Sequence, residues 1–303
     1  MREVSIRRFR FSPCVTILAA ILALGSPSFA AGNDLGLETI DPVSASLSQI
    51  LAAGMATWRQ PALEVYRWNA FPDVLILDLR GFLQQDRMFA RLAYFVEKRG
   101  FRGTLLTDAQ LEGRHGWNAH DYGPDGLASF FNAAASARFP LTAEELALRR
   151  LALAQGVISE QGGLYAPGSG GVLSVTHSSS AIERRYLLTH ESFHGIFFSS
   201  AAYRDVCFRL WDSLPDGERS FYATFLDSLG YDGSDRYLAV NEFQAYLMQQ
   251  PLGMAVSYFD RFIKRFAEEG TPVAITPEDL LASARALDAY LRASFGFGAG
   301  AGL

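Results

Sequence analysis

The stretch LLTHESFH at residues 187–194 decides how this sequence is interpreted. Its two histidines, His190 and His194, are four residues apart, and Glu191 directly follows the first. On an α-helix, such positions lie one turn apart on the same face, so both imidazoles can reach one metal ion. In a chain with five histidines, chance produces this combination about 0.004 times. The stretch therefore predicts a metal site in which Glu191 is the general base for a metal-bound water.

The surrounding sequence supports a helix over residues 180–198. Ser180 can cap its first turn, and Glu183 stands three residues later, where a capping box places an acidic side chain. The helical pattern continues almost to residue 294, interrupted by Pro215, Gly230 and Pro251, among others. The motif thus opens a long helical region.

A zinc ion in a catalytic site takes three protein ligands and leaves one position open. The extended pattern HExxHxxGxxH is absent, because Phe197 and Ser200 stand where it requires glycine and histidine. A carboxylate from a later helix is the remaining option, and Glu242 lies in an apolar helical stretch at residues 240–246. Asp235 is its chief rival. Cys207 is the residue that could instead close a structural zinc site.

The HExxH motif followed by a downstream helical NExxx segment, residues 241–245, resembles the gluzincin, thermolysin-like zinc metallopeptidases. The resemblance covers two predicted helices. It implies one zinc ion per chain with His190, His194 and Glu242 as ligands, and Glu191 as catalytic base. Those peptidases often carry aspartate four residues after the ligand glutamate; this chain has Tyr246, so the groups supporting the ligands must differ.

Further catalytic candidates come from a polar loop and from tyrosines. His115 and His120 fall within residues 111–125, a loop that can supply an oxyanion donor or a substrate clamp, or whose histidines simply cap backbone carbonyls. His120 and Tyr246 are the predicted catalytic residues besides Glu191, and Tyr237 is a weaker candidate. His177 ends a strand before the metal helix, and the resemblance implies that such an edge strand pairs with an extended peptide substrate; a surface histidine is the alternative.

The first half of the chain predicts a smaller α/β part. An amphipathic helix is expected at residues 41–58, strands at 74–77, 103–106 and 172–176, and helices at 83–98, 126–138 and 142–155. The expected fold is helix-rich α+β, with a zincin-like core built from the active-site helix and the ligand helix. The predicted regions are 31–160 (N-terminal α/β), 161–294 (catalytic, helical) and 295–303 (a flexible tail).

Residues 1–30 have the order of a secretory signal peptide: four arginines in the first ten positions, a short apolar stretch, and small residues before a cut after Ala30. The cut would change the net charge from −5 to −8 and leave Cys207 as the one cysteine. We expect a secreted or periplasmic protein without stable membrane insertion after cleavage. The acidic balance and the lack of a basic run argue against nucleic-acid binding.

Together these features predict a secreted zinc-dependent metallopeptidase that hydrolyses peptide or protein substrates. One alternative is a secreted binding or assembly protein with a structural or vestigial zinc site; Glu191 argues against it, because a structural site needs no base. Another makes the N-terminal α/β part a small-ligand module, although a GxGxxG pattern is missing between residues 77 and 83.

Overall fold

A five-stranded mixed sheet is the framework of the part of the chain that the computed structural model describes, residues 35–271 and 273–302. In spatial order its strands are β1 (Val43–Ala45), β2 (Leu63–Trp68), β3 (Val74–Leu79), β7 (Gly171–Thr176) and β4 (His120–Tyr122). β1 is parallel to β2 and β3 to β7, while β2 is antiparallel to β3 and β4 to β7. β5 (Ile158–Gln161) and β6 (Leu164–Pro167) form a separate hairpin.

Helices account for most of the remaining described residues. Those in the first half are α1 (Leu47–Ala52), α2 (Phe82–Val96), α3 (Asp108–Leu111), α4 (Pro124–Ser136) and α5 (Ala143–Ala154), with 3-10 turns η1 (Leu37–Thr39) and η2 (Met55–Thr57). Those in the second half are α6 (Ala181–Ser199), α7 (Ala201–Ser213), α8 (Asp216–Leu229), α9 (Arg236–Met248), α10 (Leu252–Glu268) and α11 (Pro277–Phe295). The fold is thus helix-rich α+β, as predicted.

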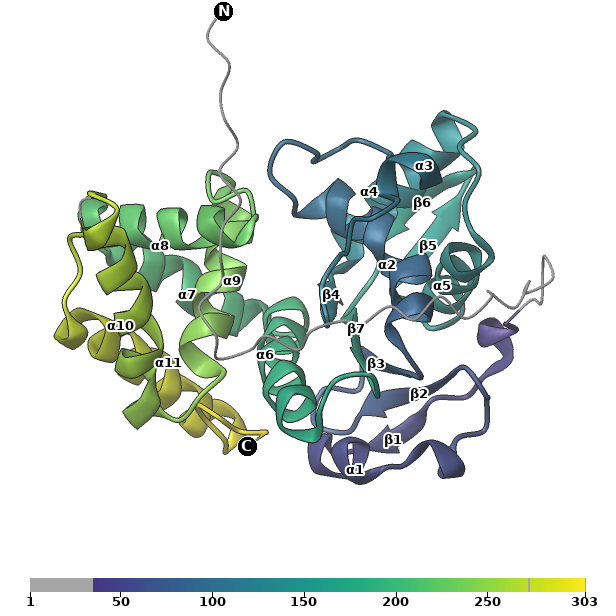
Figure 1. Cartoon of the computed structure of the whole chain (residues 1–303). Coiled ribbons are helices and arrows are strands. Elements are labelled where there is room, and N and C mark those ends of the chain that lie inside the picture. Colours follow the sequence, from purple (N-terminus) through teal and green to yellow (C-terminus); the bar gives the residue numbers. More distant parts are fainter. Residues whose placement is uncertain (1–34, 272, 303) are drawn as a thin grey trace, which may run out of the picture. The chain divides into compact units, whose positions relative to one another are not determined.

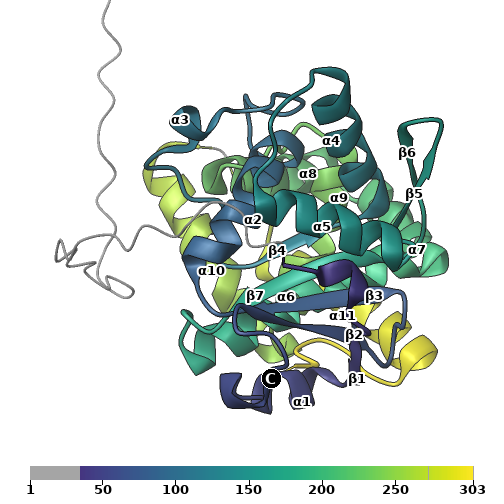
Figure 2. The ribbon, with the colours of Figure 1, turned by 90° about the vertical axis from the view of Figure 1, so that its right-hand side faces the viewer.

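The sheet separates two hydrophobic cores. On one face, alternate residues of β2 and β3 such as Val65 and Leu77 pack with α2, α4 and α5, which lie above the sheet in Figure 2. On the other face, Ile76 and Val175 pack with α6. Figure 1 shows α6 between the sheet and helices α7–α11. The central strands β3 and β7 are buried on both faces, and this burial includes polar side chains such as Asp78 and Ser174.

Several predicted elements are confirmed, with ends shifted by a few residues. The strands expected at 74–77 and 172–176 are β3 and β7, and the helices expected at 83–98, 126–138 and 142–155 are α2, α4 and α5. Thr142 and Glu145 form the expected capping box of α5. Ser180 caps α6 by accepting a hydrogen bond from the Glu183 amide.

Two predicted elements are wrong. The helix expected at 41–58 is replaced by β1, α1 and η2, because Ser46 caps a helix that starts only at Leu47 and ends before Gly54. The strand expected at 103–106 does not form. Gly103 has φ +74°, and the carbonyl of Leu106 accepts a hydrogen bond from Arg91. The parallel partner of β3 is therefore β7, which lies about a hundred residues later in the chain.

The predicted regions 31–160 and 161–294 share one sheet, since β7 lies between β3 and β4, and residues 34–303 belong to one compact unit. The segment after α11, predicted as a flexible tail, packs as far as it is described: the Phe297 ring lies 6.2 Å from that of Trp68, and the Gly300 amide donates to Met248. The predicted signal peptide lies outside the described residues. Within the described part, none of the helices has the length and apolar character needed to span a membrane.

Candidate metal centre

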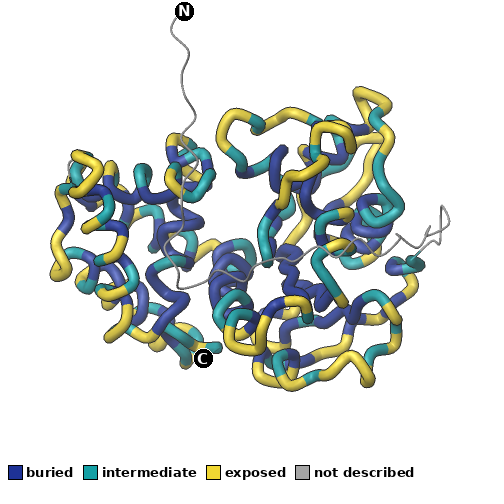
Figure 3. The backbone as a smooth tube through the Cα atoms, viewed as in Figure 1, coloured by how far each residue is buried: buried dark blue, intermediate teal, exposed yellow. Residues whose placement is uncertain are grey.

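Helix α6 carries the HExxH motif and packs on the face of the sheet that carries Ile76 and Val175. Figure 3 shows this helix among the most deeply buried segments. Gly195, next to His194, makes this close packing possible. A Cβ atom there would lie 3.1 Å from Val74 of β3 and 3.3 Å from Leu173 of β7. The motif is therefore held directly against the two central strands.

Helix α9 packs beside α6 and brings Glu242 to the two histidines. The Nε2 atoms of His190 and His194 are 3.0 Å apart, and Glu242 Oε2 lies 3.6 Å and 3.8 Å from them, respectively. All three side chains are buried. Their donor atoms surround one point, so His190, His194 and Glu242 can hold a metal ion, as the sequence predicted.

Polar side chains face the two imidazoles from outside this triangle. His190 Nδ1 donates to Gln249 Oε1 at 2.9 Å, which leaves its Nε2 lone pair facing His194 and Glu242. His194 Nδ1 faces Asp121 Oδ2 at 3.5 Å, and Asn241 donates to the same carboxylate oxygen at 3.2 Å. A buried carboxylate or amide behind a histidine ligand is the usual support of a metal site.

Four carboxylates gather at this centre. Burial raises the pKa of Glu191 well above its ordinary value, and Glu242 and Glu97 raise it further. Burial likewise raises the pKa of Asp121, with Glu191 and Glu242 adding to the effect. A bound cation would offset this repulsion. Burial lowers the pKa of His194 to about 4 although Glu242 opposes the shift, which keeps the imidazole neutral, as a metal ligand must be.

Two cavities meet the centre from different sides. The larger, about 310 Å³, is lined by His190 and Glu191 together with Asp121 and a set of aromatic side chains, namely Trp117, Tyr186, Tyr231, Tyr246 and Tyr258. The smaller, about 70 Å³, is lined by Glu242, Asn241, Asp121 and Glu97, among others. Asp121 lines both cavities, whereas His190 lines only the larger one and Glu242 only the smaller one.

The two predicted catalytic residues besides Glu191, His120 and Tyr246, lie in different places. Tyr246 lies at the centre, with its ring 4.6 Å from that of His190. His120 does not reach it. Successive residues of a strand point to opposite faces, and His120 points to the α2 face, where it stacks on Phe89 at 5.1 Å and pairs with Tyr122. Its neighbour Asp121 points to the metal centre instead.

The other candidates lie outside the ligand triangle. Asp235 caps α9 and pairs with Arg102, and Cys207 is buried in the core of the helical part. Neither belongs to a group of potential metal donors among residues 35–271 and 273–302. Tyr237 lines the smaller cavity. These positions leave Glu242 as the carboxylate that completes the triangle.

The two remaining histidines have structural contacts. His115 lies at the rim of the larger cavity, between Asp86 and Asn118. His177 contacts Asp78 at 3.1 Å and directly follows β7, which has neighbours on both sides. The edge strand beside α6 is therefore β4 and not β7, so the expected contact of His177 with a peptide on an open edge is wrong.

No motif or spacing in the sequence marks Asp121, Gln249 or Glu97 as residues of the centre. Asp121 alternates with His120, so assigning residues 120–122 to a strand would have placed one of the two at the site. Gln249 follows the end of α9, and Glu97 caps the end of α2. No motif marks either residue, because only the packing of distant elements brings them to the centre.

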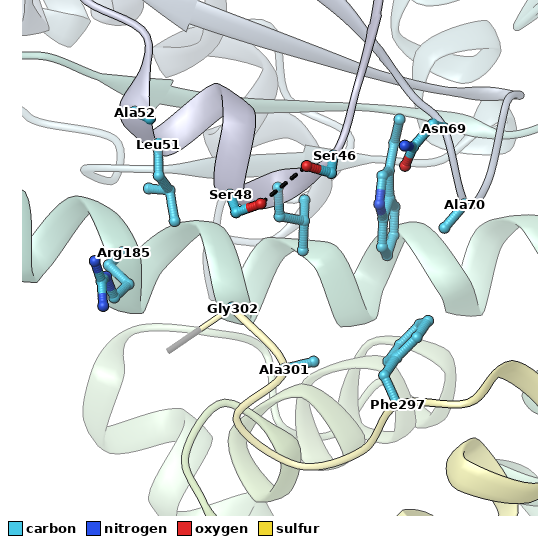
Figure 4. A pocket seen from close by; sticks show the side chains of 12 residues that line it. Ser46, Ser48, Leu51, Ala52, Asn69, Ala70, Arg185, Phe297, Ala301 and Gly302 are labelled. Carbon is cyan, nitrogen blue, oxygen red and sulfur yellow. Dashed lines mark hydrogen bonds between the residues drawn. The ribbon is translucent and has the colours of Figure 1, made fainter.

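Another cavity, of about 470 Å³, lies apart from the metal centre between α1, the start of α6 and the C-terminal segment (Figure 4). Arg185 is its charged lining residue, and Trp68 and Phe297 form part of its wall. None of the residues of the metal centre lines it.

The chain matches no protein-family model, no curated protein and no solved structure.

Proposed function

We propose that the protein is a zinc-dependent metallopeptidase with a zincin-like core. The supporting observation is the triangle of donors formed by His190, His194 and Glu242. Zinc with bonds of about 2.0–2.1 Å in tetrahedral geometry places neighbouring donors about 3.3–3.4 Å apart. The three observed separations, 3.0, 3.6 and 3.8 Å, bracket that value. Two nitrogens and one carboxylate oxygen are also donors that zinc prefers in catalytic sites.

Zinc held there would supply a water of lowered pKa and would polarise the carbonyl of the scissile bond. Glu191 lines the larger cavity directly beside His190. It takes a proton from the attacking water and transfers it to the nitrogen of the leaving amine. Tyr246 and Tyr231 line the same cavity and can donate hydrogen bonds to the developing oxyanion. Asp121 and Gln249 hold the two histidines in their binding orientation.

The substrate's place is suggested by β4. This short strand ends the sheet, and within the described residues no further strand pairs with its outer side, which is the kind of edge to which an extended peptide can add. Because Asp121 of β4 faces the centre, a peptide paired along this edge would pass close to the ligands. We further propose, from the sequence of residues 1–30, that the protein acts in the periplasm or outside the cell.

A binding or assembly protein with a structural zinc site is the second candidate. It is favoured by a second group of potential donors, Asp121, Glu191 and His194, because a fourth protein ligand closes structural sites. Asp121, however, faces Nδ1 of His194 rather than the Nε2 side of the triangle. The orientation of Asp121 therefore supports a role in holding His194, which leaves a coordination position for water.

The variant Glu191→Gln tests the proposed function. It should retain zinc, because Glu191 is not one of the three ligands, and should lower peptide hydrolysis about 10²–10⁴-fold, the usual contribution of a general base. Metal content by mass spectrometry and hydrolysis of a peptide library measure the two effects. Glu268→Gln, at an exposed position of α10, is the matched control and should behave as wild type. Hydrolysis by Glu191→Gln at the wild-type rate would exclude the proposed role of Glu191.

A further inference from the structure

The two cavities at the metal centre differ in size and in surroundings. The larger, lined by His190 and Glu191, has room for several groups of a peptide chain. The smaller, on the side of Glu242, has about 70 Å³. Its size suits an ammonium group and the atoms nearest to it better than a further stretch of peptide. A chain bound across the centre would therefore end in the smaller cavity.

A contact between two segments forms part of the wall of the smaller cavity. The residues after α2 pair with the loop between α8 and α9. Lys98 and Tyr231 form an isolated β-bridge, the Arg99 amide donates to the backbone carbonyl of Gly230, and the Asp232 amide donates to the backbone carbonyl of Glu97. The ion pairs Arg99–Asp227 and Arg102–Asp235 reinforce this contact. Three residues of the bridge region, Glu97, Arg102 and Asp235, line the cavity itself. This wall limits how far a bound chain can extend beyond the metal centre.

The lining of the smaller cavity is acidic. Its carboxylates are Glu97, Asp121, Asp125, Asp235 and Glu242. Its one cationic side chain, Arg102, is already engaged by Asp232 and Asp235. Glu97 is 4% exposed and receives a hydrogen bond from Trp117 at 2.8 Å, whereas the neighbouring Lys98 directs its ammonium group to the carbonyl of Gly116. Acidic side chains therefore outnumber basic ones in the lining of the cavity.

The cavity also has a neutral hydrogen-bond acceptor. Asn241 is 4% exposed, and its Oδ1 atom accepts no hydrogen bond from the side chains and backbone of the described residues. A buried acceptor without a donor is costly, by about 1–3 kcal/mol in typical proteins. A cationic group with several N–H donors would satisfy Asn241 Oδ1 and neutralise Glu97 together.

We propose that the smaller cavity binds the free α-ammonium group of a peptide, so that the protein removes residues from the N-terminus of its substrate. This inference rests on the proposed function. Glu97 and Asn241 accept hydrogen bonds from the ammonium group, and the chain beyond the first peptide bond lies in the larger, aromatic-lined cavity. In the reaction, the water oxygen bonds to the carbonyl carbon of the first residue, the C–N bond breaks, and the proton from water passes through Glu191 to the leaving nitrogen.

The test measures binding separately from turnover, using zinc-loaded Glu191→Gln protein and the amidated peptide Ala-Phe-Ala-Ala with a free or an acetylated N-terminus. Titration calorimetry should give at least about tenfold tighter binding of the free peptide, the effect of one hydrogen-bonded charge. Equal affinity for the two peptides would overturn the proposal.

A second variant assigns the effect to the cavity. Adding Glu97→Gln, which keeps the acceptor for Trp117, should lower the preference for the free peptide by about tenfold, whereas the exposed control Asp205→Asn should retain it. An unchanged preference in the Glu97→Gln protein would also contradict the assignment.

Wild-type protein separates this inference from the proposed function. Release of alanine from the free peptide, with no cleavage of the acetylated one, supports both. Internal cleavage of the acetylated peptide overturns the inference and leaves the peptidase. If zinc-loaded wild type cleaves neither peptide, the proposed function fails, and the binding ratio still decides whether the cavity recognises an ammonium group.

Discussion

Two polar side chains outside the ligand triangle, Asp121 and Gln249, fix which nitrogen of each histidine faces the metal position. Gln249 accepts from His190 Nδ1, and Asp121 faces His194 Nδ1. In the neutral imidazole only one nitrogen has a lone pair, so the partner of Nδ1 determines that Nε2 is the donor. The affinity of the centre thus depends on residues that do not themselves belong to the triangle.

Replacing Asp121 with Asn should weaken metal binding about 10–100-fold, the usual effect of losing a carboxylate behind a histidine ligand. Competition with a fluorescent chelator measures the affinity. Asp205→Asn, at an exposed position of α7, is the control and should keep the wild-type affinity. Identical affinities of the Asp121 and Asp205 variants would show that Asp121 does not support His194.

At this scale, the sequence predicted the residues whose spacing follows helix geometry. The proximity of His190, His194 and Glu242 was predicted and is observed. His120 does not lie at the centre. Successive residues of a strand point to opposite faces, so Asp121 points to the centre and His120 points away from it. Residues 120–122 are too few for an alternating pattern to reveal the strand. Side chains placed by long-range packing, such as Gln249, leave no periodic signal.

Among the elements, α6 is fixed to the sheet by a buried ion pair. Arg184, on the turn before the motif, contacts Asp78 of β3, and its guanidinium also donates to the carbonyls of Ile50 and Leu51. Asp78 is fully buried and receives a further contact from His177. One side chain therefore holds α1, β3 and α6 together.

Replacing Arg184 with Met should lower the free energy of unfolding by about 3–5 kcal/mol, because Asp78 would remain buried without its cation. Denaturant titration measures the change. Arg185→Met, at the exposed neighbouring position of the same helix, should change it by no more than about 0.5 kcal/mol. A similarly small effect of both variants would mean that the Arg184–Asp78 pair does not anchor α6.

The elements themselves were predicted best where the pattern was long and its ends were marked. Helices α2, α4 and α5 have clear apolar periodicity, and α5 has a capping box. The prediction for residues 41–58 was wrong because their apolar spacing suggested a single long helix. Ser46 caps the helix and Gly54 follows its end, so only residues 47–52 are helical. The strand β2 was missed because both its faces are buried and it does not alternate.

For the molecule as a whole, the metal centre joins elements that are distant in sequence: β4, α6 and α9. The sheet itself is non-local, with β7 inserted between β3 and β4. Sequence patterns describe local structure, so they could not show that regions 31–160 and 161–294 share one sheet. Bound metal should therefore stabilise the whole unit, because its ligands hold the sheet-bound α6 to the helical part.

Removing the metal should consequently lower the melting temperature of the protein. At a zinc concentration 100 times the dissociation constant, binding contributes about 2.7 kcal/mol, which corresponds to roughly 5–10 °C for a unit of this size. Calorimetric scans with and without a chelator measure the shift. His190→Ala is the control, since it should melt at the same temperature in both. A wild-type melting temperature that does not respond to the chelator would contradict this coupling.

The most direct test of the proposed centre is the amount of zinc bound per chain, measured by mass spectrometry on purified wild type and on Glu242→Gln. Three ligands around one point predict one zinc ion per wild-type chain and a marked loss in the variant, with His190→Ala losing zinc as well. Full zinc in Glu242→Gln would contradict the assignment of the third ligand. Wild-type protein that binds no zinc would contradict the metal centre itself.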